Sequence, residues 1–134
     1  GWTPAQKVQF QDLIDELRVE EFHHGDCIGV DEQAVAEVRR EHGEVIHTHP
    51  PINSTKRAMC GGHLYAPKEY LDRNHDIVDS VDILIVVPAT DEEIIRSGTW
   101  ATYRYAMKGL QNGDVPVSKV VVIFPDGRME HHHP

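Results

Sequence analysis

The stretch that decides the fold is Asp82-Ile-Leu-Ile-Val-Val-Pro88, a continuous run of apolar and mostly β-branched residues. A strand that is apolar at every position is buried on both faces, which is typical of a parallel sheet covered by helices. Lys119-Val-Val-Val-Ile-Phe-Pro125 repeats this pattern near the end of the chain. The two runs therefore predict a mainly parallel sheet inside an α/β domain.

The remaining elements alternate along the chain. Apolar spacing and capping residues predict helices at about residues 3–18, 31–42, 67–81 and 98–110, with short strands that end at Gly25 and at Pro50. This order of helix and strand, repeated four times, predicts a parallel sheet layered by helices. Doubly wound domains usually begin with a strand, whereas this sequence begins in a helix opened by Thr3-Pro4. Either the usual first strand is absent from the sequence, or the domain is a shortened variant.

The composition is that of an acidic globular domain. The chain has 134 residues, 40% of them hydrophobic and 26% charged, with a net charge of −9. We assign one domain to residues 1–130, and residues 131–134, with their consecutive histidines, to a tail that is native or derived from a tag. So acidic a surface argues against binding a nucleic-acid polymer or an anionic membrane. No apolar run approaches the roughly 20 residues of a membrane span, and two cysteines without a disulfide pattern indicate a cytoplasmic protein.

Parallel sheets bind ligands beyond the carboxyl ends of their strands, so the candidate site lies where the strands end. After the first strand comes His24-Gly-Asp-Cys-Ile-Gly-Val-Asp31. Gly25 and Gly29 allow backbone N–H groups to approach a ligand, and the following helix start favours an anion. Asp26 would orient a ribose hydroxyl. The alternative is a plain tight turn in which Asp31 stabilises the helix start by its charge.

The second strand ends in His47-Thr-His49, whose two imidazoles face the same side of the strand and are expected to converge with His23 or His24. With Asp26 and Cys27 they are acceptable ligands for zinc or another transition metal. The chain contains neither C-x-x-C nor H-E-x-x-H, so we favour hydrogen bonding of a ligand by His49 and expect neither a metal nor a cofactor. A Cys27 nucleophile is a weaker alternative, because no third group that would orient a base is evident.

Basic and polar groups follow the other strand ends. The long loop at residues 51–67 and the third helix contribute Asn53, Arg57, Arg73 and Asn74. Ahead of the fourth helix, Ser97-Gly-Thr-Trp-Ala-Thr102 supplies hydroxyls, a glycine and free N–H groups, which are typical of a phosphate site. Capping of that helix by Ser97 or Thr99 is compatible with ligand binding. On chemical grounds this segment is the strongest candidate.

Four of these motifs together resemble the SLOG superfamily, and more narrowly its bacterial and phage YspA/YpsA-related branch. They are Phe22-His-His-Gly-Asp-Cys-Ile-Gly-Val-Asp31, His49-Pro-Pro-Ile-Asn53, Tyr70-Leu-Asp-Arg-Asn74 and Arg96-Ser-Gly-Thr-Trp-Ala-Thr102. The resemblance covers nearly the whole chain and implies a Rossmann-like, three-layer α/β/α domain that binds a nucleotide or a nucleotide-derived ligand. Members of this branch usually begin with one more strand ahead of the Thr-Pro helix.

The superfamily also contains the Lonely Guy phosphoribohydrolases, which release a base from a nucleoside monophosphate. Arg73 matches the helix arginine that assists these enzymes, and Gly98-Thr99 match their Gly-Thr pair, but their catalytic glutamate corresponds to Thr102. A threonine cannot act as the carboxylate that stabilises an oxocarbenium-like centre. The resemblance therefore implies a sensing or sequestering role, with an N-glycosidase-like hydrolase that uses Arg73 as the alternative.

We therefore expect a module that binds a nucleotide-like small molecule and forms a homodimer or a higher homo-oligomer. Lonely Guy-like relatives are dimers, and a sheet without its first strand has an edge to cover. The residues expected to contact the ligand are His24, Gly25, Asp26, Gly29, Asp31, His49, Asn53, Arg57, Arg73, Asn74, Ser97, Gly98, Thr99, Trp100 and Thr102.

Overall fold

The computed structural model describes residues 1–134 as a mixed α/β fold with four helices and two small sheets. The helices are α1 (Pro4–Glu16), α2 (Val30–His42), α3 (Tyr70–Asp79) and α4 (Gly98–Asn112), with a short 3₁₀ turn, η1 (Ser54–Lys56). The strands are β1 (Phe22–His24), β2 (Ile46–Thr48), β3 (His63–Leu64), β4 (Ile83–Val86), β5 (Lys119–Ile123) and β6 (Met129–His132). The predicted α/β class is confirmed.

Each sheet contains parallel strands. The first has the order β1-β2-β3 with both pairs parallel, so that His23 lies opposite His47 and His47 opposite His63. In the second, β4 and β5 are parallel, and β6 is antiparallel to β5. Strands β3 and β6 were not expected from the sequence. The first lies inside the long loop, and the second includes His131 and His132, which the sequence analysis assigns to the tail.

Helices α1 and α4 begin where local chemistry predicts, whereas α3 begins at Tyr70, after the predicted start at about residue 67. The Thr3 side chain accepts a hydrogen bond from the Gln6 N–H (3.1 Å), and the Gln6 side chain accepts one from the Thr3 N–H (2.9 Å), which together form a capping box at the start of α1. Ser97 caps α4 by accepting from the Trp100 N–H at 3.3 Å. None of the helices has the length and apolar character that a membrane crossing requires.

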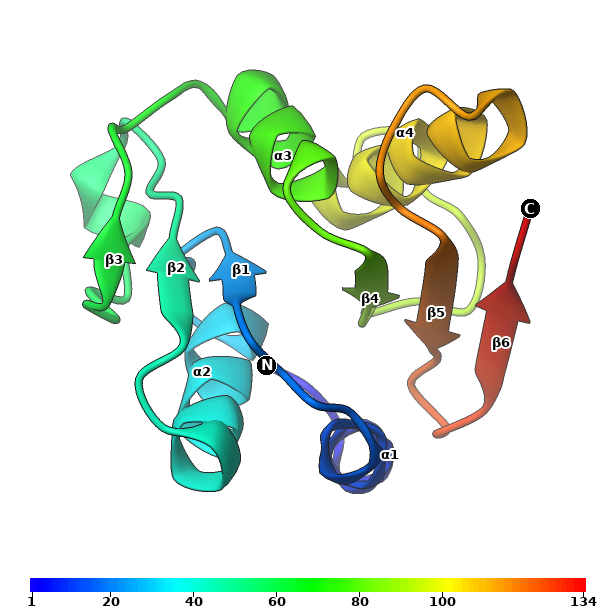
Figure 1. Ribbon diagram of the computed structural model, residues 1–134, viewed down its shortest axis with the longest axis horizontal. Helices are drawn as coiled ribbons and strands as arrows, with labels where there is room; N and C mark the ends of the chain where they lie inside the picture. The colour runs from blue at the N-terminus through cyan, green and yellow to red at the C-terminus, as the bar shows by residue number, and fades with distance from the viewer.

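Both faces of β5 are buried, as its apolar run predicts. Val121 and Ile123 pack in one core cluster with Phe10 of α1, whereas Val120 and Val122 belong to a second cluster that includes residues of α4. Because successive side chains point to opposite faces of a strand, this strand needs a helix on each side. Figure 1 shows α3 and α4 on one side of the strands, and α1 and α2 on the other.

The edge strands β1 and β4 of the two sheets are not paired with each other (Figure 1), and a cleft lies between them. This inter-sheet cleft has a volume of about 870 Å³ and is lined at its sides by β1 and β4. Phe10 and Ile14 of α1 line one face, and Arg73 and Ile77 of α3 line the other. The lining continues from residues 17–21, ahead of β1, to the segments that follow β1 and β4. The cleft therefore runs along the full length of both strands.

Candidate functional site

Many of the predicted ligand contacts gather at the end of the inter-sheet cleft beyond β1 and β4. The end of β1 with the loop after it, the start of α2, helix α3 and the start of α4 contribute the lining residues His24, Gly25, Gly29, Asp31, Arg73, Asn74, Gly98, Thr99 and Thr102. These residues come from three motifs that are distant in the sequence. The topology brings them together because loops that follow parallel strands meet at the same edge of the sheet.

Arg73 is the cationic group at this end of the cleft. The residue is only 5% exposed, and its Nη1 donates to the carbonyl oxygens of Gly25 and His49, the latter at 3.2 Å. Its Nε donates to Asn74 Oδ1 at 2.8 Å. The contact of Nη2 is a weak one, to the Cys27 sulfur at 3.9 Å. The guanidinium is therefore held in a fixed orientation and retains donor capacity at Nη2 for an anion.

Gly25 separates Arg73 from the carboxylate of Asp31. A Cβ at this glycine would lie 2.5 Å from Arg73 Nη1 and 3.1 Å from Asp31 Oδ2, so a larger residue would displace both groups. Asp31 Oδ2 accepts from the Cys27 N–H at 3.1 Å. Burial raises the pKa of Asp31, although the Cys27 hydrogen bond and the charge of Arg73 act in the opposite direction. Gly25 thus allows the Arg73 guanidinium and the Asp31 carboxyl group to lie close to each other at this end of the cleft.

The start of α4 presents unused backbone donors to the same cavity. Gly98 and Thr99 are the first two helical residues, and their N–H groups have no partner within the helix. The next N–H is taken by the Ser97 cap. Thr102 donates its hydroxyl to the Gly98 carbonyl oxygen at 2.9 Å, so this side chain supports the helix start. The positive end of the helix dipole therefore faces the cleft with two free donors.

Other predicted contacts have structural partners and do not line the cleft: Asp26, His49, Asn53, Arg57, Ser97 and Trp100. Asp26 is fully buried and accepts from Arg57 Nε at 2.7 Å and from the Cys60 N–H at 2.9 Å. Burial alone would raise the pKa of Asp26, but these hydrogen bonds and the arginine charge hold it below its usual value. The Asp26–Arg57 pair therefore joins the loop after β1 to the long loop.

The buried histidines near the cleft are neutral at physiological pH. His24 contacts Thr48 Oγ1 through Nε2 at 2.8 Å and accepts from the Asp26 N–H through Nδ1 at 3.0 Å. Burial lowers the pKa of His24 and of His49 to about 4. Neutral imidazoles provide hydrogen bonds without positive charge. Arg73 therefore has to supply the charge that neutralises an anion at this end of the cleft.

The predicted convergence of His47 and His49 with His23 is confirmed, because the His23 ring stacks on His47 and His23 Nδ1 lies 2.8 Å from His49 Nε2. Sequence reasoning missed Glu21 and Tyr65, which complete this polar group on the first sheet. His23 Nε2 lies 2.8 Å from Glu21 Oε1, and His47 Nδ1 lies 3.0 Å from the Tyr65 hydroxyl. The spacing of Glu21 and His23 on one strand face was available as a signal, but the register of β1 on β2 was not. The metal donor set considered from the sequence is not assembled. His47 groups with Glu21 and His23, whereas Asp26 groups with His24 and Cys60.

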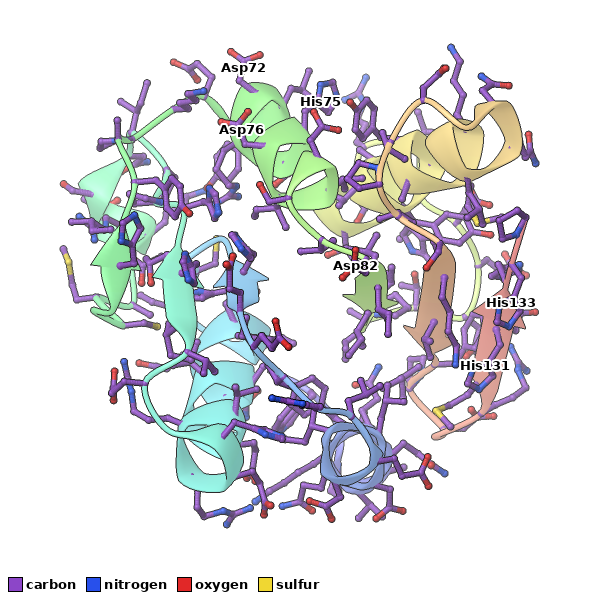
Figure 2. The ribbon with its side chains drawn as sticks, in the orientation of Figure 1. Asp72, His75, Asp76, Asp82, His131 and His133 are labelled. Carbon is purple, nitrogen blue, oxygen red and sulfur yellow. The ribbon has the colours of Figure 1, made fainter.

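A second, shallower depression of about 530 Å³ lies along α3. Its lining consists of Ile52, Pro67, Lys68, Glu69, Asp72, His75 and Asp76. Figure 2 shows Asp72, His75 and Asp76 projecting from α3. The one lysine, Lys68, is already paired with Asp76 at 2.6 Å. This acidic lining repels an anionic ligand, which leaves the inter-sheet cleft as the better candidate.

Neither a protein-family model nor a curated protein nor a solved structure matches this chain. The case for a function therefore depends on the residues that line the cleft. A glycine loop, one buried arginine and one open helix start suit a small anion that also carries polar groups.

Proposed function

We propose that the chain binds a nucleotide or a nucleotide-derived small molecule at the carboxyl end of the inter-sheet cleft. The observation that supports this most is the convergence of Arg73 with the free N–H groups of Gly98 and Thr99 on one cavity. A fixed guanidinium and an open helix start make a local anion site on a chain whose net charge is −9. Phosphate is the anion that such a pair binds best in nucleotide sites.

The proposed arrangement divides the ligand between two segments. The phosphate lies against the start of α4 and Arg73, while the sugar or base extends along the glycine loop at Gly25 and Gly29. Gly29, which has a positive φ of 110°, immediately precedes α2 and lines the cleft. The motifs shared with the SLOG superfamily support a role in sensing or sequestering such a ligand.

We also propose that the two sheets belong to one Rossmann-like, three-layer α/β/α domain from which a central strand is absent. In a parallel ladder, alternate residues turn their N–H and C=O groups to opposite neighbours. The Phe22 N–H donates to the Val45 carbonyl oxygen, just ahead of β2, and the Asp82 carbonyl oxygen accepts from the Lys119 N–H at the start of β5. The backbone groups of His23, Ile83 and Ile85 are therefore directed into the inter-sheet cleft, where a strand inserted between β1 and β4 would bond them.

Gly1 marks the place where such a strand would end. Gly1 lines the inter-sheet cleft, and the Trp2 N–H donates to Gln33 Oε1 in the first turn of α2 at 2.9 Å. Thr3 Oγ1 donates to the Pro125 carbonyl oxygen, just after β5, at 2.6 Å. The start of α1 therefore lies at the carboxyl edge of both sheets. A strand leading into Gly1 would run parallel to β1 and β4, with α1 as the crossover to β1.

An N-glycosidase that acts on nucleotides is the second candidate, because Arg73 lies in the cleft where that chemistry would need it. The chemistry also needs a carboxylate. At the carboxyl end of the cleft the lining contains one carboxylate, that of Asp31. Asp31 already accepts a hydrogen bond from the Cys27 N–H. The Thr102 hydroxyl is bonded to Gly98. These contacts favour binding without turnover.

Self-association in the cytoplasm is part of the same proposal. The outer edge strands β3 and β6 each have a neighbour on one side only, which favours pairing with a second copy. Apolar side chains at Leu64 and Leu71 are more than half exposed. Both cysteines are free thiols, as in reducing compartments.

The test begins with the ligand that accompanies the purified chain. Mass spectrometry of the denatured protein should detect a phosphorylated nucleoside derivative at close to one per chain, and none from an Arg73→Lys variant, since lysine cannot reproduce the fixed fork. Arg128→Lys is the matched control, because Arg128 is exposed and lies outside the lining of the cleft. Incubation with nucleoside monophosphates should release no free base. Base release that disappears in Arg73→Ala would instead establish the hydrolase, and a chain with no nucleotide affinity would remove both candidates.

A further inference from the structure

Three side chains on the first sheet form a cluster that the proposed function does not use: Glu21, His23 and His47. Their ligand atoms, one carboxylate oxygen and two imidazole nitrogens, all lie within 4.8 Å of one another. Glu21 Oε1 is 2.8 Å from His23 Nε2 and 3.8 Å from His47 Nε2. Ligands about 2.1 Å from a tetrahedral zinc ion are about 3.4 Å apart, so these separations fit one coordination sphere.

The backbone determines this grouping. His23 and His47 occupy opposing positions on the parallel strands β1 and β2, and their rings are stacked with centres 4.6 Å apart. Glu21 precedes His23 by two residues and therefore falls on the same face of the strand. Because both histidines are on strands of one sheet, small adjustments of the Glu21 side chain suffice to complete the set.

The second nitrogen of each imidazole has its own partner. His23 Nδ1 lies 2.8 Å from His49 Nε2, and His47 Nδ1 lies 3.0 Å from the Tyr65 hydroxyl. When both histidines donate from Nδ1 to these partners, Nε2 of each is unprotonated and available on the side of Glu21. Hydrogen bonds of this kind fix the tautomer and the orientation of metal-binding histidines.

We propose that Glu21, His23 and His47 bind one divalent transition-metal ion of the zinc type. Two imidazoles and one carboxylate are ligands that zinc, cobalt and iron accept, while calcium and magnesium prefer oxygen alone. The Glu21 side chain is 57% exposed, so a fourth position stays open to water. Without a metal, a proton on His23 Nε2 bonds to Glu21 and His23 Nδ1 accepts from His49. Binding of the ion to His23 Nε2 moves that proton to His23 Nδ1, which then donates a hydrogen bond to His49 Nε2, and His49 carries its own proton on Nδ1. The proposal of a metal site does not rest on the proposed nucleotide binding, although Glu21 and His23 also line the inter-sheet cleft.

The experiment must first remove the competing histidines of the C-terminal segment. Figure 2 shows His131 on β6 and His133 just beyond its end, at the opposite side of the molecule from β2 in Figure 1. A background variant with His131→Gln, His132→Gln and His133→Gln therefore eliminates a separate metal-binding segment without touching the cluster. Calorimetric titration of this variant with Zn²⁺, and absorption spectra with Co²⁺, report stoichiometry and geometry.

We expect one Zn²⁺ per chain and a tetrahedral Co²⁺ spectrum. Glu21→Gln and His47→Gln should each weaken Zn²⁺ binding at least about tenfold, while His75→Gln, on α3, should leave it unchanged. Glu21 is exposed, so its substitution does not threaten the fold, and circular dichroism confirms folding of each variant. Absence of Zn²⁺ binding in the background variant, or binding that Glu21→Gln and His47→Gln leave unaltered, would overturn the proposal.

Discussion

A strand added ahead of Gly1 should fill the inter-sheet cleft and stabilise the fold. The variant carries five alternating valine and isoleucine residues fused directly to Gly1. The backbone groups of His23, Ile83 and Ile85 offer about six hydrogen bonds, at about 1 kcal/mol net each. Fixing five residues costs about 1–2 kcal/mol each, so these two contributions roughly cancel. The gain then comes from the side chains that α1 and α3 cover.

The side chains set the expected magnitude. Three β-branched side chains that become buried in the cleft, against Phe10 of α1 or Ile77 of α3, contribute about 1.5–3 kcal/mol each, which gives an upper limit of about 9 kcal/mol. We expect an increase of at least about 3 kcal/mol in the free energy of unfolding, measured by urea denaturation. Amide hydrogen exchange gives the local readout. The amides of His23, Ile83 and Ile85 should become protected in the fusion and exchange faster in the chain without it.

The matched control carries the same length of added chain, with proline at the central position, which removes a ladder hydrogen bond and disfavours a central strand. It should show neither the added stability nor the protection. The reasoning is refuted if the apolar fusion leaves exchange at these amides unchanged, or if the proline control protects them equally.

Three further predictions follow from the contacts around the cleft. Asp26→Asn keeps the shape of the residue at φ 56° but removes the charge-assisted bond to Arg57, so the free energy of unfolding at neutral pH should fall by about 2 kcal/mol. Because the pKa of Asp26 is lowered in the folded state, its contribution is present above the unfolded pKa of about 4 and is lost as the pH falls toward the folded value. The wild-type chain should therefore lose more stability than Asp26→Asn below about pH 4, and parallel urea curves for the two chains would contradict this. Gly25→Ala places a Cβ 2.5 Å from Arg73 Nη1 and should cost about 2 kcal/mol, measured by thermal denaturation; an unchanged midpoint would show that Arg73 is not held as described. Light scattering should report a homodimer, and a monomer at working concentration would remove the proposed self-association.

The main strands were predictable because their information is local. The runs around β4 and β5 are apolar at every position, and Thr3 and Ser97 cap the helices that follow them. β6 was not predictable from its sequence, because Met129-Glu-His-His has no apolar alternation. It forms because the outer edge of β5 offers a ladder, which is a property of the assembled sheet.

The candidate site was predictable in position and less so in detail. The rule that ligands lie beyond the strand ends led to the glycine loop, Arg73 and the start of α4. It did not reveal that Asp26 forms an ion pair with Arg57, because these residues are 31 positions apart and the fold of the long loop brings them together. Nor did it reveal that Glu21 lies beside His47, which depends on strand register.

The most direct test of the anion site uses one position with two substitutions. Gly98 is the first residue of α4, where proline fits the helix but lacks the N–H, and the extended backbone of Ser97 (φ −81°, ψ 129°) is compatible with a following proline. A Cβ at Gly98 meets nothing within 4 Å, so Gly98→Ala retains the donor without a clash.

The deciding measurement is calorimetric titration of a nucleoside monophosphate, and of the same nucleoside without phosphate, into the wild-type, Gly98→Pro and Gly98→Ala chains. Loss of one charge-assisted hydrogen bond should weaken binding of the monophosphate to Gly98→Pro by about 10-fold to 100-fold. Gly98→Ala should bind as the wild type does, and the nucleoside should bind far more weakly than its monophosphate. Equal affinity of Gly98→Pro and Gly98→Ala, or equal affinity for nucleoside and monophosphate, would contradict a phosphate site at the start of α4.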